Sequence, residues 1–313
     1  MIILALVARR IPLDAFRDAI EHGPHVQLGL VMLALTCGIL CTDSLTVWVG
    51  LRALGLRRPK RDVLAIRGAT YLLVIVNYAL GQGAFGVYLN RTGLPGLRAV
   101  GATLFLVGTN LAMLMLGTLA VWSFGSSAPP HDALWWTLVL GCSGFAVYLV
   151  VIALAPRFLA SNALLAPLFD AGVRGHLIAL FGRLPHTVMI VVAPWIAIRV
   201  WGIPVPAAAG LTLMPIVAIA TVLPISPAGL GTAQVALVYF FGHWATDTKV
   251  LAFSIVYFVY GLLASAIVGF VSMSLARRYG ILATDAAGSE HTGELGLPAS
   301  SGSARSGRAE ASS

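Results

Sequence analysis

The chain has 313 residues, of which 58% are apolar and only 10% are charged, with a mean hydropathy of +0.90 and a formal net charge of +8. About a quarter of the residues are charged in soluble globular domains, so this composition excludes that class and indicates an integral membrane protein. The surplus of Lys and Arg lies mainly between apolar segments, which favours membrane topology and anionic lipid over nucleic acid as its cause.

The distribution of apolar residues divides the chain into three parts. Residues 1–25 form an N-terminal interfacial segment, in which residues 11–20 place apolar side chains on one side of a short helix. Residues 26–280 form the transmembrane domain. Residues 281–313 are rich in Ser, Gly and Ala without an apolar period, and we expect this tail to be disordered.

The transmembrane domain is expected to be all-α. Its apolar stretches are long enough to cross a hydrocarbon core of ~30 Å as helices, which takes about 20 residues. We expect a polytopic bundle of about seven or eight spans with one broken or re-entrant element. The expected spans are residues 26–51, 64–89, 99–124, 134–155, 176–201, 206–223 and 250–276. The polar segment 156–175 is expected to be interfacial or re-entrant.

Basic residues indicate the orientation. Residues 51–67 contain Arg and Lys at six positions against Asp62 alone, and the positive-inside rule therefore predicts a cytoplasmic loop. Arg277 and Arg278 follow the last expected span, so the C-terminus is expected in the cytoplasm as well. These patterns are typical of a multi-pass protein of the bacterial inner membrane.

Polar side chains within the first two expected spans are candidate site residues. A carboxylate such as Asp43 is costly inside a membrane, so it either faces a partner or polar cavity or lies close to the water interface. Asn77 and Gln82 lie in a glycine-rich part of the second span. Transporters often have Gly- or Pro-interrupted segments at corresponding places in two halves, and the second half of this chain contains such a segment.

Arg183 lies inside the fifth expected span, two residues before Pro185. A buried arginine needs a partner or water, and the proline frees a carbonyl nearby. Two interpretations remain open. Arg183 either extends its side chain to the interface or faces the broken helix described next, where it would hold an anionic headgroup.

Residues 221–242 combine strong apolar character with Pro224, Pro227, Gly229 and Gly231. Proline removes an amide donor and clashes with the preceding turn, so one uninterrupted helix is excluded. In hydrocarbon, a broken backbone is tolerated only where protein or water satisfies its polar groups. We therefore expect a break that is buried in the protein or lines a cavity.

The break has a direction. Ser226 followed by Pro227 is a helix-start signal, and the new helix is expected to include Gln234. Its free amides and positive dipole end suit a phosphate or carboxylate. The alternative interpretation is a Pro/Gly bend that serves only close helix packing.

The same residues carry a family resemblance. The run from Leu223 to Gly231, LPISPAGLG, followed by Gln234 and an apolar helix, resembles the flippase-like family of the lysylphosphatidylglycerol synthase transmembrane region. The resemblance covers roughly residues 175–275. Members usually carry a second glycine where this chain has Ala228 and a glutamate where it has Gln234. In the first half the family shows a proline and an acidic residue after its Asn, and both are missing after Asn77.

The resemblance implies a transporter with a membrane lipid as partner: an anionic or aminoacylated phospholipid, or a lipid-linked precursor. The family's synthase activity resides in a separate soluble domain, which we do not find, so aminoacyl transfer is not expected. We expect no cofactor, no nucleic-acid partner and no metal, since Cys37 and Cys41 share a helix face without a neighbouring His. The predicted headgroup-binding residues are Arg183, Ser226, Gly229, Gly231, Gln234, Asp43, Asn77 and Gln82, with Pro224 and Pro227 breaking the helix.

Two other functions are considered. The string Gly141-Cys142-Ser143-Gly144 resembles the Gly-x-Ser-Gly of rhomboid intramembrane serine proteases, for which His186 would have to serve as the base. A non-transporting membrane scaffold is the other alternative. The scaffold predicts no polar cavity connected to the break, whereas a transporter predicts one lined by Arg183, Asn77 or Gln82.

Overall fold

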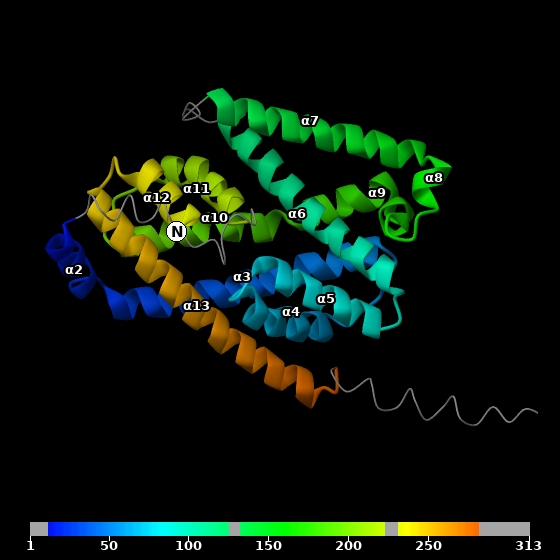
Figure 1. Ribbon diagram of the computed structural model, residues 1–313, viewed down its shortest axis with the longest axis horizontal. Coiled ribbons are helices and arrows are strands. Elements are labelled where there is room, and N and C mark those ends of the chain that lie inside the picture. Colours follow the sequence, from blue (N-terminus) through cyan, green and yellow to red (C-terminus); the bar gives the residue numbers. More distant parts are fainter. Residues whose placement is uncertain (1–11, 125–131, 223–230, 282–313) are drawn as a thin grey trace, which may run out of the picture.

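The computed structural model describes residues 12–124, 132–222 and 231–281, and all regular secondary structure in these ranges is helical (Figure 1). The expected all-α class is therefore confirmed. The helices are α2 (Leu13–Glu21), α3 (His25–Ala53), α4 (Lys60–Val74), α5 (Tyr78–Arg91), α6 (Gly96–Phe124), α7 (Asp132–Leu154), α8 (Arg157–Ala160), α9 (Ala166–Gly182), α10 (Leu184–Val200), α11 (Ala207–Val222), α12 (Thr232–Phe241) and α13 (Asp247–Arg278).

Five helical segments of the described chain are long and apolar enough to cross a membrane: α3, α6, α7, the continuous pair α9–α10, and α13. The α9–α10 rod spans 35 residues. It includes much of the segment 156–175, which we expected to be interfacial or re-entrant. The rod bends at Gly172, where φ is +57°, a conformation that glycine adopts without steric cost. These segments make the chain a multi-pass membrane protein.

The expected span 64–89 differs from the structure, because two short helices replace it. Helices α4 and α5 have 15 and 14 residues, so each is only about 22 Å long and falls short of a ~30 Å core. The chain reverses at Asn77, whose backbone is extended and whose side chain accepts a hydrogen bond from the Ala79 amide (2.7 Å). The Arg58 guanidinium, before α4, donates to the Thr92 carbonyl, after α5 (2.6 Å). The hairpin therefore begins and ends at the same end of the molecule.

Helices α11 and α12 make a second short pair at the opposite end. They have 16 and 10 residues. Val205, just before α11, and Phe241, the last residue of α12, lie in one buried apolar cluster with the start of α13. The expected span 206–223 is thus the short helix α11. Residues 223–230, which would join the two helices, lie outside the described ranges.

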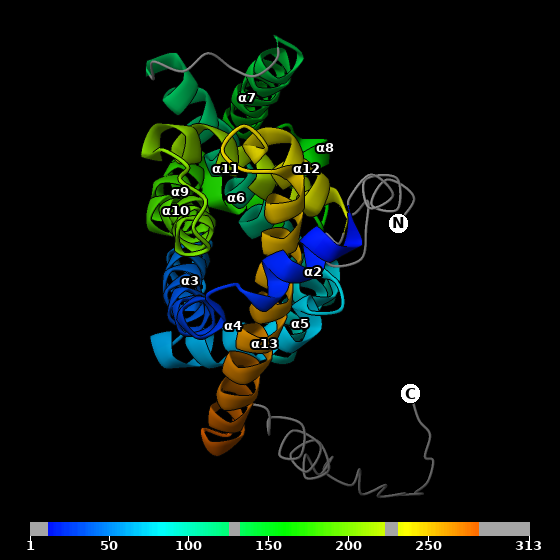
Figure 2. The same cartoon turned by 90° about the vertical axis from the view of Figure 1, so that its left-hand side faces the viewer.

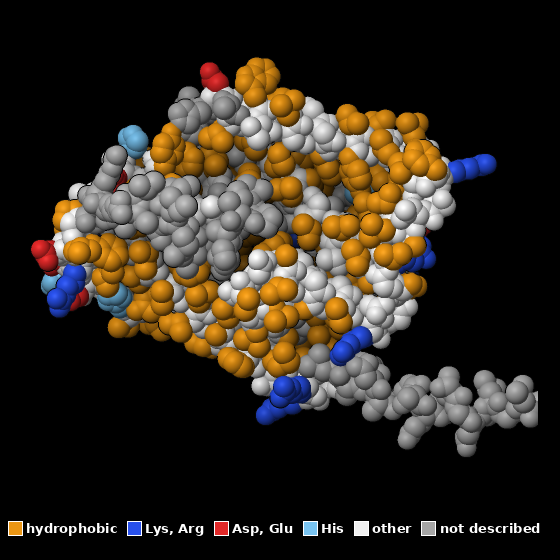
Figure 3. Space-filling model, in the orientation of Figure 1, with side chains coloured by type: hydrophobic (Ala, Val, Ile, Leu, Met, Phe, Trp, Pro, Cys, Tyr) orange, Lys and Arg blue, Asp and Glu red, His pale blue; other side chains and the backbone are white. Residues whose placement is uncertain are grey.

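The two ends of the bundle differ in charge. At one end, Arg52 and Lys60 both lie over the ring of Trp48, at 4.6 and 4.5 Å from its centroid, and Arg61 lies 5.8 Å from the ring of Tyr279 after α13. Arg52, Lys60 and Arg61 of the basic segment 51–67 therefore share this end with the end of α13, in agreement with their common basic character. In Figure 3, Lys and Arg gather mainly at the right and lower edges, and apolar side chains cover the surface between the ends.

Two apolar cores lie at the two ends of the bundle. The core at the basic end centres on the α4–α5 hairpin and includes Leu51, Phe85 and Phe105. The core at the other end, with Phe241 and Phe253, joins α10 to α13. Helix α7 lies on the outside of this arrangement and packs mainly against α6 and α9 (Figure 2).

Candidate functional site

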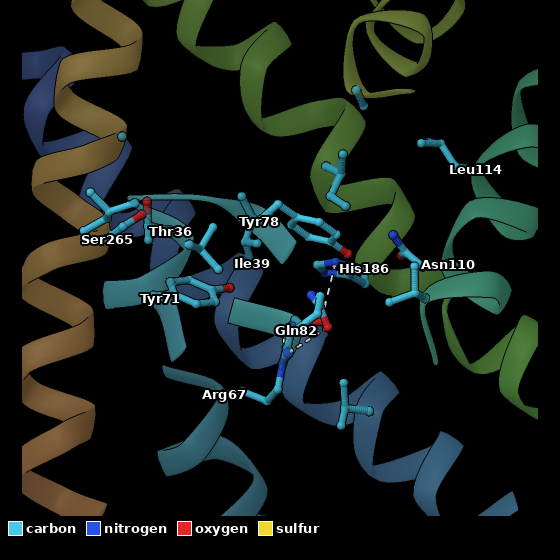
Figure 4. A pocket seen from close by; sticks show the side chains of 18 of the residues that line it. Thr36, Ile39, Arg67, Tyr71, Tyr78, Gln82, Asn110, Leu114, His186 and Ser265 are labelled. Carbon is cyan, nitrogen blue, oxygen red and sulfur yellow. Dashed lines mark hydrogen bonds and ion pairs between the residues drawn. The ribbon is translucent and has the colours of Figure 1, made fainter. Parts of the chain in front are cut away.

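A cavity of about 400 Å³ lies between the two cores. Its lining residues come from the middle of α3, α6, α9–α10 and α13, from the inner ends of α4 and α5, and from Ala218 of α11 (Figure 4). Four of the five long helical segments contribute to it at mid-length, so the cavity lies near half the depth of the membrane-crossing layer. Its polar and aromatic lining residues include Thr36, Asp43, Arg67, Tyr71, Tyr78, Gln82, Asn110, Arg183, His186, Tyr257 and Ser265.

An ion pair between Asp43 and Arg67 forms one wall of the cavity. Asp43 on α3 and Arg67 on α4 are 4% and 6% exposed, and both Nε and an Nη of the arginine lie 2.7 Å from Oδ2 of the carboxylate. Another Nη of Arg67 donates to the Gln82 side chain on α5 (3.4 Å), and its guanidinium lies 5.3 Å from the ring of Phe85. The pair is electrically neutral and joins α3 to the α4–α5 hairpin.

Arg183 occupies a different part of the lining and has no carboxylate partner among the described residues. It is 4% exposed and lies at the junction of α9 and α10. Its Nε donates to the Thr109 hydroxyl (3.3 Å) and an Nη to the side-chain Oδ1 of Asn110 (3.2 Å), both on α6. These bonds use two of the five N–H donors of a guanidinium and leave its charge uncompensated. The interpretation that Arg183 extends to the membrane interface is wrong for this position.

His186 lies one turn after Arg183 and is 6% exposed. Its Nδ1 is 3.4 Å from the Thr42 hydroxyl and its Nε2 is 3.7 Å from Oδ1 of Asp43. Figure 4 shows His186, Gln82 and Arg67 close together on one side of the cavity, with Asn110 beside His186. The histidine therefore lies between the neutral ion pair and the uncompensated arginine.

The rest of the lining is largely apolar and aromatic. Tyr71 and Tyr78 come from the inner ends of α4 and α5, and Tyr257, Phe258 and Leu262 come from α13. Such a wall suits apolar groups of a ligand, while the polar residues suit a charged group. Pockets of 300–1,000 Å³ are the usual size for small ligands and cofactors, so about 400 Å³ is sufficient for one headgroup.

The predicted site residues separate into three groups. Asp43, Gln82 and Arg183 line the cavity together. Asn77 caps α5, and Gln234 accepts from the Gly231 amide (2.6 Å) at the start of α12, so their side chains serve helix ends and are not among the lining residues. Gly231 itself has φ +104°, which only glycine adopts readily. The remaining predicted residues, Pro224, Ser226, Pro227 and Gly229, lie outside the described ranges.

Sequence reasoning missed several residues of the cavity. Arg67 was assigned to the basic loop and His186 was considered only as a protease base, while Tyr71 and Tyr78 were not considered. One signal was present: a carboxylate such as Asp43 in a span needs a cationic partner, and Arg67 is the arginine that falls within the expected second span.

The protease interpretation finds no support in the geometry. Ser143 is exposed on α7, whereas His186 is buried beside Thr42 and Asp43, and no hydrogen bond joins Ser143 to His186 in the described part of the chain. Within those same ranges, no group of three or more His, Cys, Asp and Glu side chains could hold a metal ion.

A function can therefore be inferred only from the geometry of the cavity, and the resemblance to the flippase-like family stays a prediction. No protein-family model matches the chain, and no curated protein matches it significantly.

Proposed function

We propose that this protein binds the anionic headgroup of a membrane lipid or lipid-linked molecule in its central cavity and carries it across the bacterial inner membrane. The observation on which the proposal rests is Arg183, a buried cation that faces the cavity and has no carboxylate partner among the described residues. An ionised side chain at membrane depth is costly unless paired, and such residues mark substrate pathways. A phosphate or carboxylate would supply the missing negative charge.

The net charge of the lining residues supports a ligand whose headgroup has a net charge of −1. Arg67 and Asp43 cancel one another through their 2.7 Å contacts, which leaves Arg183 as the net charge when His186 is neutral. The phosphodiester of phosphatidylglycerol carries one negative charge and several acceptor oxygens and gives the headgroup a net charge of −1, whereas in phosphatidylcholine the choline cation cancels the charge of the same group. Arginine binds such oxygens through two parallel N–H donors, and Arg183 retains donors for this purpose.

The arrangement of the helices supports transport. Two short helix pairs approach mid-depth from opposite ends, α4–α5 from the basic end and α11–α12 from the other. Discontinuous helices that meet at a midplane site are typical of secondary transporters, in which one part of the molecule moves against another around the site. By the positive-inside rule, the basic end with the C-terminal end of α13 faces the cytoplasm.

Binding can be tested with a water-soluble anionic phospholipid, dihexanoyl phosphatidylglycerol, and its zwitterionic counterpart dihexanoyl phosphatidylcholine. The purified protein in a non-ionic detergent is expected to bind the anionic lipid at least about tenfold more tightly, a difference of about 1.4 kcal/mol. Arg183→Gln should abolish this preference. Arg199→Gln, a control on the same rod with an exposed arginine, should leave it unchanged. Equal affinity for the two lipids, or a preference that survives Arg183→Gln, would contradict the proposal.

Translocation needs a separate measurement. Vesicles containing the protein and a phosphatidylglycerol with a fluorophore attached to an acyl chain near the headgroup can be treated with a membrane-impermeant quencher. Wild-type protein is expected to expose inner-leaflet lipid faster than protein-free vesicles, and Arg183→Gln should remove the increase. Binding without any increase would favour the non-transporting scaffold.

A further inference from the structure

We propose that His186 takes up a proton when an anion occupies the cavity, so that the protein binds its anionic ligand together with one proton. The inference rests on the proposed function, and it adds a second ligand, the proton, with a specific acceptor atom. It follows from the hydrogen bonds of His186 and from the three charges around it.

The hydrogen bonds of Thr42 determine where the neutral imidazole carries its hydrogen. The hydroxyl of Thr42 donates to backbone carbonyls one turn earlier in α3, those of Gly38 (2.9 Å) and Ile39 (3.0 Å). Its only hydrogen is thus committed, so the hydroxyl must accept from Nδ1 of His186 at 3.4 Å. The neutral tautomer therefore has its hydrogen on Nδ1 and a lone pair on Nε2.

That lone pair faces a second acceptor. Nε2 of His186 is 3.7 Å from Oδ1 of Asp43, whereas both bonds from Arg67 go to the other oxygen, Oδ2. Two acceptors that face each other at 3.7 Å gain nothing from one another, and the distance exceeds that of a hydrogen bond. A proton on Nε2 would turn this contact into an ion pair that a small movement shortens. Nε2 is therefore the atom at which the site can accept a proton.

The surrounding charges explain why proton uptake would follow anion binding. The negative charge of Asp43 on α3 attracts an imidazolium, whereas the positive charges of Arg67 on α4 and Arg183 at the α9–α10 junction repel it. Arg67 and Asp43 cancel, which leaves Arg183 as the opposing charge in the empty cavity. A bound anion neutralises Arg183 and adds its own attraction. The tyrosines that also line the cavity are Tyr71, Tyr78 and Tyr257, and α6 and α11 contribute no titratable side chain to its lining within the described residues.

Linkage makes the effect reciprocal. If the anion raises the affinity of His186 for a proton, the proton must raise the affinity for the anion by the same factor. Over the pH range in which the ring is protonated in the complex but neutral in the free protein, the dissociation constant of the anion is expected to rise about tenfold for each unit by which the pH increases. A protein that releases both ligands on the other side would couple lipid movement to a proton gradient.

The test is isothermal titration calorimetry with dihexanoyl phosphatidylglycerol at fixed pH in buffers of different protonation enthalpy. The slope of the observed enthalpy against the buffer's protonation enthalpy gives the number of protons taken up. Wild-type protein is expected to take up close to one proton per lipid on the acidic side of neutrality, and His186→Gln none. His22→Gln, which alters an exposed histidine of the chain segment before α3, should behave as wild type.

The outcomes separate this inference from the function on which it rests. If wild-type protein binds the anionic lipid without proton uptake, or if His186→Gln still takes up a proton, the inference is overturned and the headgroup site stands. If the lipid does not bind at all, the proposed function fails first. Should His186→Gln not fold, ¹⁵N NMR of histidine-labelled wild-type protein gives the answer: an imidazolium signal must appear on addition of the lipid, and its absence overturns the inference.

Discussion

Breaking the Asp43–Arg67 pair from either side should destabilise the protein strongly, and removing both charges should largely restore it. Asp43→Asn keeps the size of the side chain but leaves the buried Arg67 guanidinium without a counter-ion. Arg67→Gln leaves the Asp43 carboxylate with only the more distant His186 and Arg183. The double variant places two neutral amides in the same space, with Gln82 beside them.

The magnitude follows from the contact distance and the burial of both groups. At 2.7 Å the Coulomb energy of the pair is at most about 6 kcal/mol for an effective dielectric constant near 20, and desolvation offsets part of it. Removing one partner of a buried pair typically costs about 3–5 kcal/mol. With about 2–4 °C of melting temperature per kcal/mol, each single variant should melt about 6–20 °C below wild type. The double variant should lose much less than the sum.

The assay is thermal unfolding of the purified protein in detergent, followed by its tryptophan fluorescence. Glu21→Gln provides a matched control, because it removes an ion pair of similar length, Arg17–Glu21 at 2.6 Å, that is exposed on α2. Exposed pairs contribute little, so this variant should stay within about 2 °C of wild type.

Additive losses in the double variant would refute the reasoning, because they would mean that Asp43 and Arg67 do not stabilise each other. A second readout is independent of stability. Asp43→Asn raises the net charge of the cavity by one, so anionic lipid should bind more tightly to this variant and Arg67→Gln should weaken binding. The reverse order would contradict the charge assignment.

Two further predictions concern helix contacts away from the ion pair. Gln234→Leu removes the acceptor that caps α12, so it should lower the stability by about 0.5–2 kcal/mol, measured as a lower melting temperature. Anionic lipid should still bind to this variant with wild-type affinity. Loss of binding at unchanged stability would instead place Gln234 in the headgroup site. Gly68→Ala places a methyl group 2.4 Å from Cβ of Ser272 where α4 meets α13, and this overpacking should lower the stability by about 1–3 kcal/mol, measured as a lower melting temperature. A second substitution, Ser272→Gly, should restore the stability of this variant, whereas Ser272→Ala should not. Restoration by both or by neither would contradict the steric explanation.

Hydropathy predicted the long helices well, because an uninterrupted apolar run has few alternatives in a membrane. The expected spans 99–124 and 134–155 correspond to α6 and α7 within three residues at each end. The expected span 64–89 has the same length and apolar content as the span 99–124, yet it folds as a hairpin. Its turn at Ile75, Val76 and Asn77 contains neither proline nor glycine, so only the capping tendency of Asn77 indicated it. Apolar content does not reveal the direction of the chain.

The sequence indicated some individual polar residues of the site, but it did not indicate which of them pair with one another. Asp43 and Arg183 are conspicuous because charges inside apolar spans are costly. Arg67 was hidden by its basic neighbours in the sequence. Helix α4 begins at Lys60, and seven residues of helix carry Arg67 about 10 Å away from that end, far enough to reach Asp43. Such a contact depends on the register of two helices, which no local pattern encodes.

The two arginines of the cavity differ in a way that defines what each can do. Arg67 receives a full counter-charge from Asp43, so a ligand that bound to it would have to displace that carboxylate and repay its desolvation. Arg183 receives only neutral oxygens from Thr109 and Asn110, and within the described chain the nearest candidate carboxylate is already committed to Arg67. An incoming anion therefore gains more at Arg183 than at Arg67, because there it removes an existing cost instead of creating one. The fold thus leaves one buried charge for a partner from outside the chain, which is how a site can favour an anion without containing one.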